Sequence, residues 1–157
     1  MHSKIAAAFA ALASAGIAVA QTATTPPAVD FSTARVAPGS WTYQATPTGS
    51  AARFVDATGI ARLAIECSKA SRRVTIARTT AAPAPSIFVW TSNGSRSLPV
   101  RFEANAMRVS AELAAFDALL DAIAFSRGRI GVTMAGAEAL VVPAWPEPAR
   151  TIEDCRI

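Results

Sequence analysis

The feature that most constrains the fold of this chain is a series of short segments in which apolar and polar residues alternate. A period of two puts successive side chains on opposite faces of a β-strand. Glycine, proline and asparagine residues between the segments favour turns. The predicted strands cover residues 41–45, 51–56, 60–67, 72–78, 86–91, 96–102, 107–113, 129–134 and 138–144. We therefore expect a sheet of closely spaced strands, mainly antiparallel.

The turn before residue 96 gives the strongest hairpin signal. Asn93 and Gly94 stand between two alternating segments, and both residue types tolerate the backbone angles of a two-residue turn. Asn93 also begins a glycosylation sequon, but the turn explains the glycine physically and is the favoured interpretation. Pro99 cannot donate a hydrogen bond to a neighbouring strand, so its segment is expected at a sheet edge or a bulge.

In two other segments the apolar residues recur with a period of about 3.6 instead of two. This spacing predicts helices over residues 114–127 and 146–155. The apolar stripe of the first contains Phe116, Leu119, Leu120, Ile123 and Ala124. The stripe of the second contains Trp145, Ala149, Ile152 and Cys155. The expected fold class is α+β, mostly β: an antiparallel sandwich or rolled sheet of about eight to nine short strands with two helices.

The first 20 residues have the organisation of a secretory signal peptide. Lys4 precedes an apolar segment, and Ala18-Val19-Ala20 is the small-x-small pattern that signal peptidase cleaves. The segment is too short and too rich in alanine to span a bilayer well. We expect cleavage before Gln21, a periplasmic or secreted location, and no stable membrane span afterwards.

The remaining chain is predicted to contain a flexible leader and one domain. Residues 21–38 are rich in Thr, Pro and Ala without periodicity, which predicts a leader that contacts the domain near Phe31 or Val36. Residues 39–157 are predicted to form a single β-rich domain. Removal of 20 of the 157 residues leaves about 137, enough for one modest core.

Cleavage would change the chemistry of the chain, because it removes the only histidine, His2. Ser-His-Asp and Cys-His catalysis, and zinc sites that need imidazole, are then excluded. Lys4 is also lost, which leaves Lys69 and thirteen arginines against 11 acidic residues, a net charge near +3. This charge is spread over strand positions without a basic run or interleaved aromatic residues, so nucleic-acid binding is not expected.

Two cysteines, Cys67 and Cys155, remain in the mature chain. Cys67 shares the apolar face of its predicted strand with Leu63 and Ile65, and Cys155 follows Ile152 on the apolar face of its predicted helix. An oxidising compartment favours the joining of such a pair. A catalytic or redox thiol would need a histidine partner or a CxxC spacing. We predict one intramolecular disulfide between these two residues, without a catalytic role.

Other polar and aromatic groups give weaker signals. Asp117 and Asp121 lie one helical turn apart, as paired catalytic carboxylates can, but acids opposite an apolar stripe are typical of a solvated face. The pairs Arg72-Arg73 and Arg127/Arg129 suit an anionic ligand, since guanidinium binds two oxygens. The three tryptophans could line a cleft, although packing is the more common role. They are Trp41, Trp90 and Trp145.

The chain also resembles a group of short exported proteins of alphaproteobacteria that have no assigned activity. The similarity is carried by "GSWTYQA", "ARLAIECSKASRRVTIAR", "LLDAIAFSRGRI" and "PAWPEPARTIEDCR". The segments with "L-x-I-x-C", "V-x-I" and a cysteine near the C-terminus are similar to TagO-like accessory proteins of type VI secretion. Both resemblances imply a periplasmic domain, and neither supplies a catalytic residue.

From these features we expect an exported, non-enzymatic binding or assembly module whose partner is an envelope protein or an anionic ligand. One alternative is an accessory subunit of an envelope or secretion machine. The other is a glycan hydrolase that uses only carboxylates, which would need two acids facing each other across a cleft. No catalytic, metal-binding or cofactor-binding residue is predicted.

Overall fold

The computed structural model describes residues 29–157. The predicted signal peptide, residues 1–20, and residues 21–28 of the predicted leader lie outside this part. None of the helices within residues 29–157 has the length and apolar character needed to cross a membrane.

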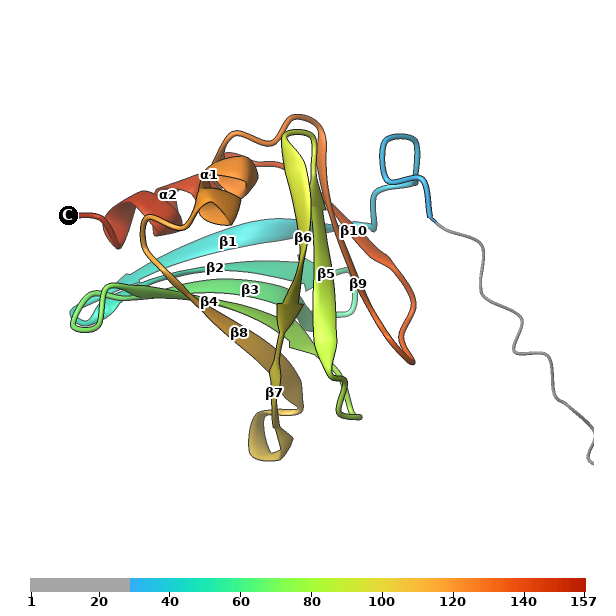
Figure 1. The fold of residues 1–157 in the computed structure, drawn as a ribbon, viewed down its shortest axis with the longest axis horizontal. Coiled ribbons are helices and arrows are strands. Elements are labelled where there is room, and N and C mark those ends of the chain that lie inside the picture. The colour runs from blue at the N-terminus through green and yellow to red at the C-terminus, as the bar shows by residue number, and fades with distance from the viewer. Residues whose placement is uncertain (1–28) are drawn as a thin grey trace, which may run out of the picture.

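Two antiparallel sheets pack face to face around one apolar core (Figure 1). The larger contains, in order across the sheet, β1 (Gly39–Thr46), β2 (Gly49–Asp56), β3 (Ala61–Ser68), β4 (Arg73–Thr79), β8 (Arg108–Ala114) and β7 (Arg101–Glu103). The smaller contains β10 (Leu140–Pro143), β9 (Arg129–Met134), β5 (Ser86–Thr91) and β6 (Gly94–Pro99). The predicted fold class, α+β and mostly β, is confirmed.

On each side of the sandwich, an edge strand of the larger sheet is linked to an edge strand of the smaller sheet, so the sandwich is a rolled structure. At one side the chain passes from β6 in the smaller sheet to β7 in the larger through Val100. At the other side, β1 and β10 lie close together. There the Ala37 amide donates to the Val141 carbonyl at 2.8 Å, and Trp41 Nε1 donates to the Pro143 carbonyl at 2.8 Å.

The change of sheet at Val100 corrects one predicted strand. Residues 96–102 were expected to form one strand, but β6 ends at Pro99 and β7 begins at Arg101. Pro99 has no N–H group, and β6 is an edge strand, as its proline predicts. The predicted hairpin is also confirmed, because Thr91 and Gly94 form the closing pair of β5 and β6.

Helices α1 (Ala118–Ala124) and α2 (Pro146–Asp154) lie side by side at one end of the sandwich (Figure 1). α2 packs on β2 and β3, and α1 packs on β6. A short 3₁₀ helix, η1 (Ala104–Ala106), joins β7 to β8.

The first helix is shorter than predicted. Phe116 was expected on its apolar stripe, but this residue precedes the helix and is 68% exposed. β8 extends to Ala114, and the Asp117 carboxylate accepts a hydrogen bond from the Leu119 amide at 2.8 Å. An aspartate in this role defines the N-cap, so the helix begins after it. Trp145, expected to face inward, is similarly the N-cap of α2 and is 44% exposed.

Residues 29–38, which we call the strap, run along the smaller sheet and into β1. The Phe31 ring is buried and stacks on Trp90 with ring centroids 5.8 Å apart. Gly131 makes room for this ring, because a Cβ atom there would lie 2.2 Å from Phe31 Cδ1. Arg129 Nη1 donates to the Ala34 carbonyl at 2.6 Å. The strap therefore has fixed contacts with the domain at several points.

Candidate ligand-binding site

The predicted disulfide joins β3 to the C-terminal helix. Cys67 and Cys155 form this bridge with their Cα atoms 5.4 Å apart, within the usual range for bridged cysteines. Both residues are buried. The bridge spans a sequence separation of 88 residues and fixes the end of α2 to the larger sheet.

The two aspartates considered as a catalytic pair have separate partners. Asp117 caps α1 and forms an ion pair with Arg96 at 2.7 Å. Asp121 forms an ion pair with Arg156, also at 2.7 Å. Each carboxylate is thus held by its own arginine, and the pair serves the packing of α1.

Three of the four arginines in the two pairs named in the sequence analysis also contact other parts of the fold. Arg72 donates to the Arg156 carbonyl at 2.5 Å and lies 5.9 Å from the centre of the Phe116 ring. Arg73 lies 3.7 Å from Glu112, and Arg129 binds the strap.

The tryptophans lie in different surroundings. Trp41 is in the core, Trp90 is on the outer face of the smaller sheet beneath Phe31, and Trp145 begins α2. They do not line a common cleft.

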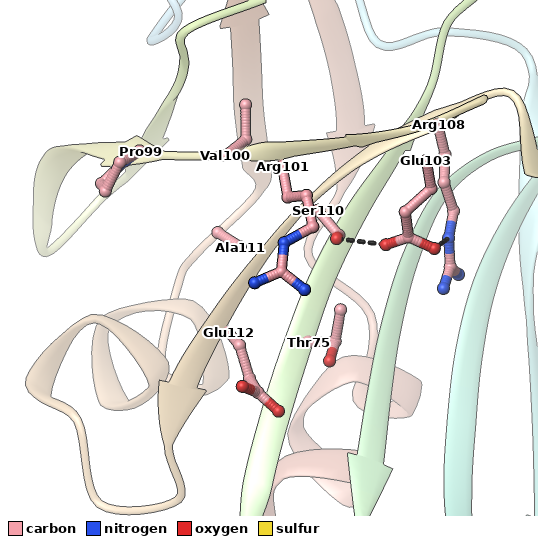
Figure 2. A pocket seen from close by; sticks show the side chains of 9 residues that line it. All are labelled: Thr75, Pro99, Val100, Arg101, Glu103, Arg108, Ser110, Ala111 and Glu112. Carbon is pink, nitrogen blue, oxygen red and sulfur yellow. Dashed lines mark hydrogen bonds and ion pairs between the residues drawn. The ribbon is translucent and has the colours of Figure 1, made fainter.

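A cavity of about 470 Å³ lies beside β7 and β8 and is lined by two acids, Glu103 and Glu112 (Figure 2). Glu103 accepts hydrogen bonds from Ser110 Oγ and from Arg108 Nε, the latter at 2.9 Å. The Ser110 hydrogen bond, followed by that of Arg108, lowers the pKa of Glu103. A glycosidase general acid needs the opposite shift, so these contacts suit a structural carboxylate better.

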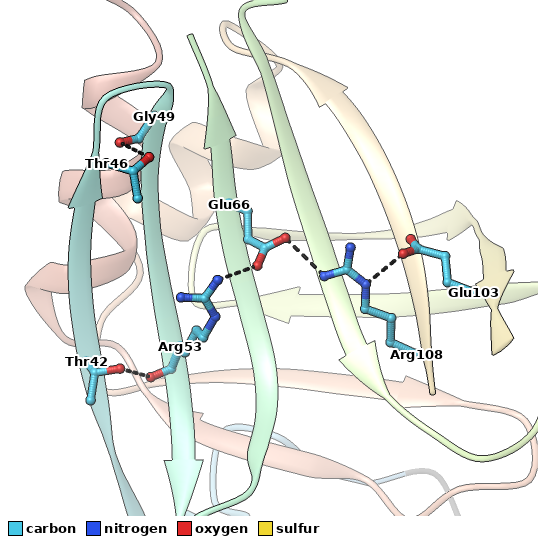
Figure 3. A network of polar contacts seen from close by, with 7 residues as sticks. All are labelled: Thr42, Thr46, Gly49, Arg53, Glu66, Glu103 and Arg108. Carbon is cyan, nitrogen blue, oxygen red and sulfur yellow. Dashed lines mark hydrogen bonds and ion pairs between the residues drawn. The ribbon is translucent and has the colours of Figure 1, made fainter. Parts of the chain in front are cut away.

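Glu103 is also the end of a row of alternating charges across the outer face of the larger sheet (Figure 3). Arg53 contacts Glu66 at 2.9 Å, and Arg108 contacts Glu66 at 3.0 Å and Glu103 at 2.9 Å. Partly exposed ion pairs of this kind contribute little stability individually. Each charge already has an opposite partner, so the row offers little to a charged ligand.

A second cavity, of about 430 Å³, differs because a buried cation lines it. It lies at the end of the sandwich opposite the disulfide, between the end of β2, the start of β3, the loop before β10 and residues 35–38 of the strap. Its apolar walls include Val36, Pro38, Phe54, Leu140 and Val141. The cation is Arg78, at the end of β4.

Arg78 lies on the inward face of β4, together with Val74 and Ile76, and is only 4% exposed. Its Nη1 donates to the Val132 carbonyl at 2.5 Å, and its Nη2 donates to the Glu138 carbonyl. Guanidinium has five N–H groups. Within residues 29–157, these two contacts are its hydrogen bonds to protein, so three N–H groups remain for water or a ligand.

The surroundings of Arg78 do not neutralise its charge. The ion pairs within residues 29–157 do not include it. Burial, and after it the nearby charge of Arg62, lower the pKa of Arg78 to about 10, whereas Glu138 opposes the shift. The side chain therefore remains protonated at neutral pH. A desolvated cation that contacts only backbone carbonyls would be stabilised by an anion beside it.

The mouth of the cavity adds two more guanidinium groups, those of Arg35 and Arg62. Arg62 contacts Asp56 at 3.4 Å. The Asp56 carboxylate also accepts hydrogen bonds from the Thr58 hydroxyl and the Ile60 amide, and its pKa is lowered chiefly by Thr58. Asp56 is thus engaged by its own turn, and the balance of charge at the cavity is positive.

The sequence itself contains a signal that Arg78 faces the core. In the segment at residues 72–78, the period of two places Arg78 on the same face as Val74 and Ile76. An arginine at an inward strand position needs internal acceptors. Those acceptors are carbonyls of β9 and of the loop before β10, far away in the sequence.

The part of the chain that the structure describes contains no group of three or more His, Cys, Asp or Glu side chains placed to hold a metal ion. Comparison with protein-family models, curated proteins and solved structures finds no match for this chain. These comparisons do not bear on the resemblance to exported alphaproteobacterial proteins or to TagO-like proteins.

Proposed function

We propose that this protein is an exported, non-enzymatic binding module that holds an anionic ligand on Arg78. The observation that carries the proposal is a guanidinium that is 4% exposed, lines a cavity of about 430 Å³ and has three N–H groups without a protein acceptor in residues 29–157. Ligand sites typically combine apolar walls with a few converging polar groups.

A non-enzymatic role agrees with the chemistry of the groups present. The only histidine is His2, within the predicted signal peptide, and both cysteines are joined in the disulfide. A usual proton acceptor near neutral pH and a free thiol are then both missing from the mature chain. Arg78 itself cannot act as a base at neutral pH, so binding is the role that its position supports.

Export is supported by the signal-like pattern of residues 1–20 and by the disulfide, since disulfides persist mainly in oxidising compartments. Mass spectrometry of the protein recovered from its native cell tests this part. We expect a mature chain that begins at or near Gln21 in the extracytoplasmic fraction. Recovery there of a chain that retains Lys4 would contradict signal cleavage.

Binding is tested with the mature protein and a panel of small anions, cations and neutral compounds. NMR titration should show saturable shifts at residues 35–38 and around Arg78 for anions only. Arg78→Lys keeps the charge but loses the planar fork, and should weaken binding at least tenfold. Arg127→Gln, at an exposed loop position, is the control and should bind normally. If no anion shifts these residues in the folded wild-type protein, the proposal fails without reference to a variant.

A further inference from the structure

We infer that the ligand of this cavity is an amphiphile, with one carboxylate on Arg78 and an apolar chain along the walls. This inference rests on the proposed function and names the chemical class of the anion. Three features support the inference: the charges around the cavity, the apolar character of its walls, and the contacts that fix the strap in place.

The charges favour a single negative group. The ion pairs within residues 29–157 include neither Arg78 nor Arg35, whereas Arg62 at the mouth is paired with Asp56. Glu138, near Arg78, would repel additional negative charge. Three arginines and two acids line the cavity, which leaves one positive charge in excess (three minus two), so a dianion such as phosphate would exceed it by one negative charge. A carboxylate brings one charge and two oxygens, which match adjacent N–H groups of a guanidinium.

The walls favour an apolar chain. Phe54 and Leu140 are buried residues that line the cavity from opposite sheets, and Val36 and Pro38 line it from the strap. An inorganic anion would contact Arg78 but would leave Val36, which is partly exposed, and Pro38, which is exposed, in contact with water. An alkyl chain would remove them from water, and each buried methylene strengthens binding about fourfold.

The strap wall is fixed before any ligand arrives. Phe31 stacks on Trp90, Arg129 holds the Ala34 carbonyl, and the Ala37 amide donates to Val141. Val36 lies between these contacts. A preformed wall reduces the ordering cost of binding, so the apolar contacts contribute to affinity.

The test compares acetate, butyrate, hexanoate and octanoate by calorimetry with the mature protein, below the concentrations at which they aggregate. The expected affinity rises about fourfold per methylene until the cavity is filled. Octanol and octylamine should bind at least tenfold more weakly than octanoate, and inorganic phosphate should not compete. Val36→Ser should flatten the dependence on chain length, whereas the control Arg127→Gln, at an exposed position outside the cavity, should leave both this dependence and acetate binding unchanged.

The outcomes separate this inference from the proposed function. Equal affinity for acetate and octanoate, or preference for phosphate, would contradict the inference that the ligand is an amphiphile. The proposal that Arg78 binds an anion would still stand. Octanol that binds as tightly as octanoate would overturn the role of the carboxylate. If no member of the anion series binds and no other anion shifts the residues around Arg78, both proposals fail.

Discussion

The ring of Phe31 in the strap stacks on the indole of Trp90, with centroids 5.8 Å apart and planes inclined by 25°. Gly131, the partner of Trp90 in the neighbouring strand β9, leaves the space that the Phe31 ring occupies. This contact attaches the strap to the outer face of the smaller sheet, next to the residues that wall the candidate site.

Gly131→Ala should detach the Phe31 ring, because the added Cβ would lie 2.2 Å from Phe31 Cδ1. Overpacking of this kind costs about 1–3 kcal/mol. Urea unfolding should show this loss, and the tryptophan fluorescence should shift towards that of an exposed indole. In a Phe31→Ala background the same substitution should cost much less. An equal cost in both backgrounds would show that Phe31 is not the obstacle.

Removal of the disulfide by the double substitution Cys67→Ser and Cys155→Ser should lower the free energy of unfolding by about 2–5 kcal/mol. The bridge fixes α2 to β3, so hydrogen exchange should accelerate first in α2. The backbone amides of β9, in the other sheet, serve as the internal reference. An unchanged urea midpoint, or two titrating thiols in the native protein, would contradict a stabilising bridge.

Asp117 has two partners whose contributions can be separated. Asp117→Ala removes both the N-cap of α1 and the ion pair with Arg96, and should cost about 1 kcal/mol or slightly more. Asp117→Asn keeps a capping oxygen and should cost much less. Arg96→Gln removes only the partly exposed ion pair, at about 0.2–1 kcal/mol. If the Asn and Ala variants unfold at the same urea concentration, capping is not the main role of Asp117.

The sequence predicts which side chains face inward more reliably than which strands pair. The alternation over residues 96–102 continues through Pro99, although β6 and β7 belong to different sheets. The alternation of apolar and polar residues indicates which face of a strand each side chain is on. It does not indicate which sheet the strand belongs to. The disulfide was predictable for a simpler reason: both cysteines are on apolar faces, and the chain has no third.

The position of the candidate site was not predictable from the sequence. The arginine pairs that suit an anionic ligand by their pattern, Arg72-Arg73 and Arg127/Arg129, are not the ones that line the cavity. Arg78 becomes a buried cation because Val132 and Glu138 supply carbonyl acceptors from another part of the chain. Such acceptors depend on how the sheets are stacked, which a local pattern does not contain.

Glu103 should make the stability of the protein depend on pH in the acidic range. Hydrogen bonds from Ser110 and then Arg108 lower the pKa of Glu103 in the folded state, so the unfolded chain binds a proton at a higher pH than the folded chain does. The stability that this difference provides is present above the unfolded pKa, about 4.3 for glutamate, and is lost as the pH falls through the folded pKa. Glu103→Gln removes the titrating group.

The difference in unfolding free energy between the wild type and Glu103→Gln should therefore be largest near neutral pH and shrink as the pH falls below about 4.3. Urea unfolding at a series of pH values measures it, and the subtraction cancels the contributions of other carboxylates. Glu112→Gln is the control on the neighbouring strand, because Glu112 contacts only Arg73, at 3.7 Å, among the ion pairs of residues 29–157. A wild-type advantage over Glu103→Gln that stays constant down to low pH would show that the Ser110 and Arg108 contacts do not favour the ionised carboxylate.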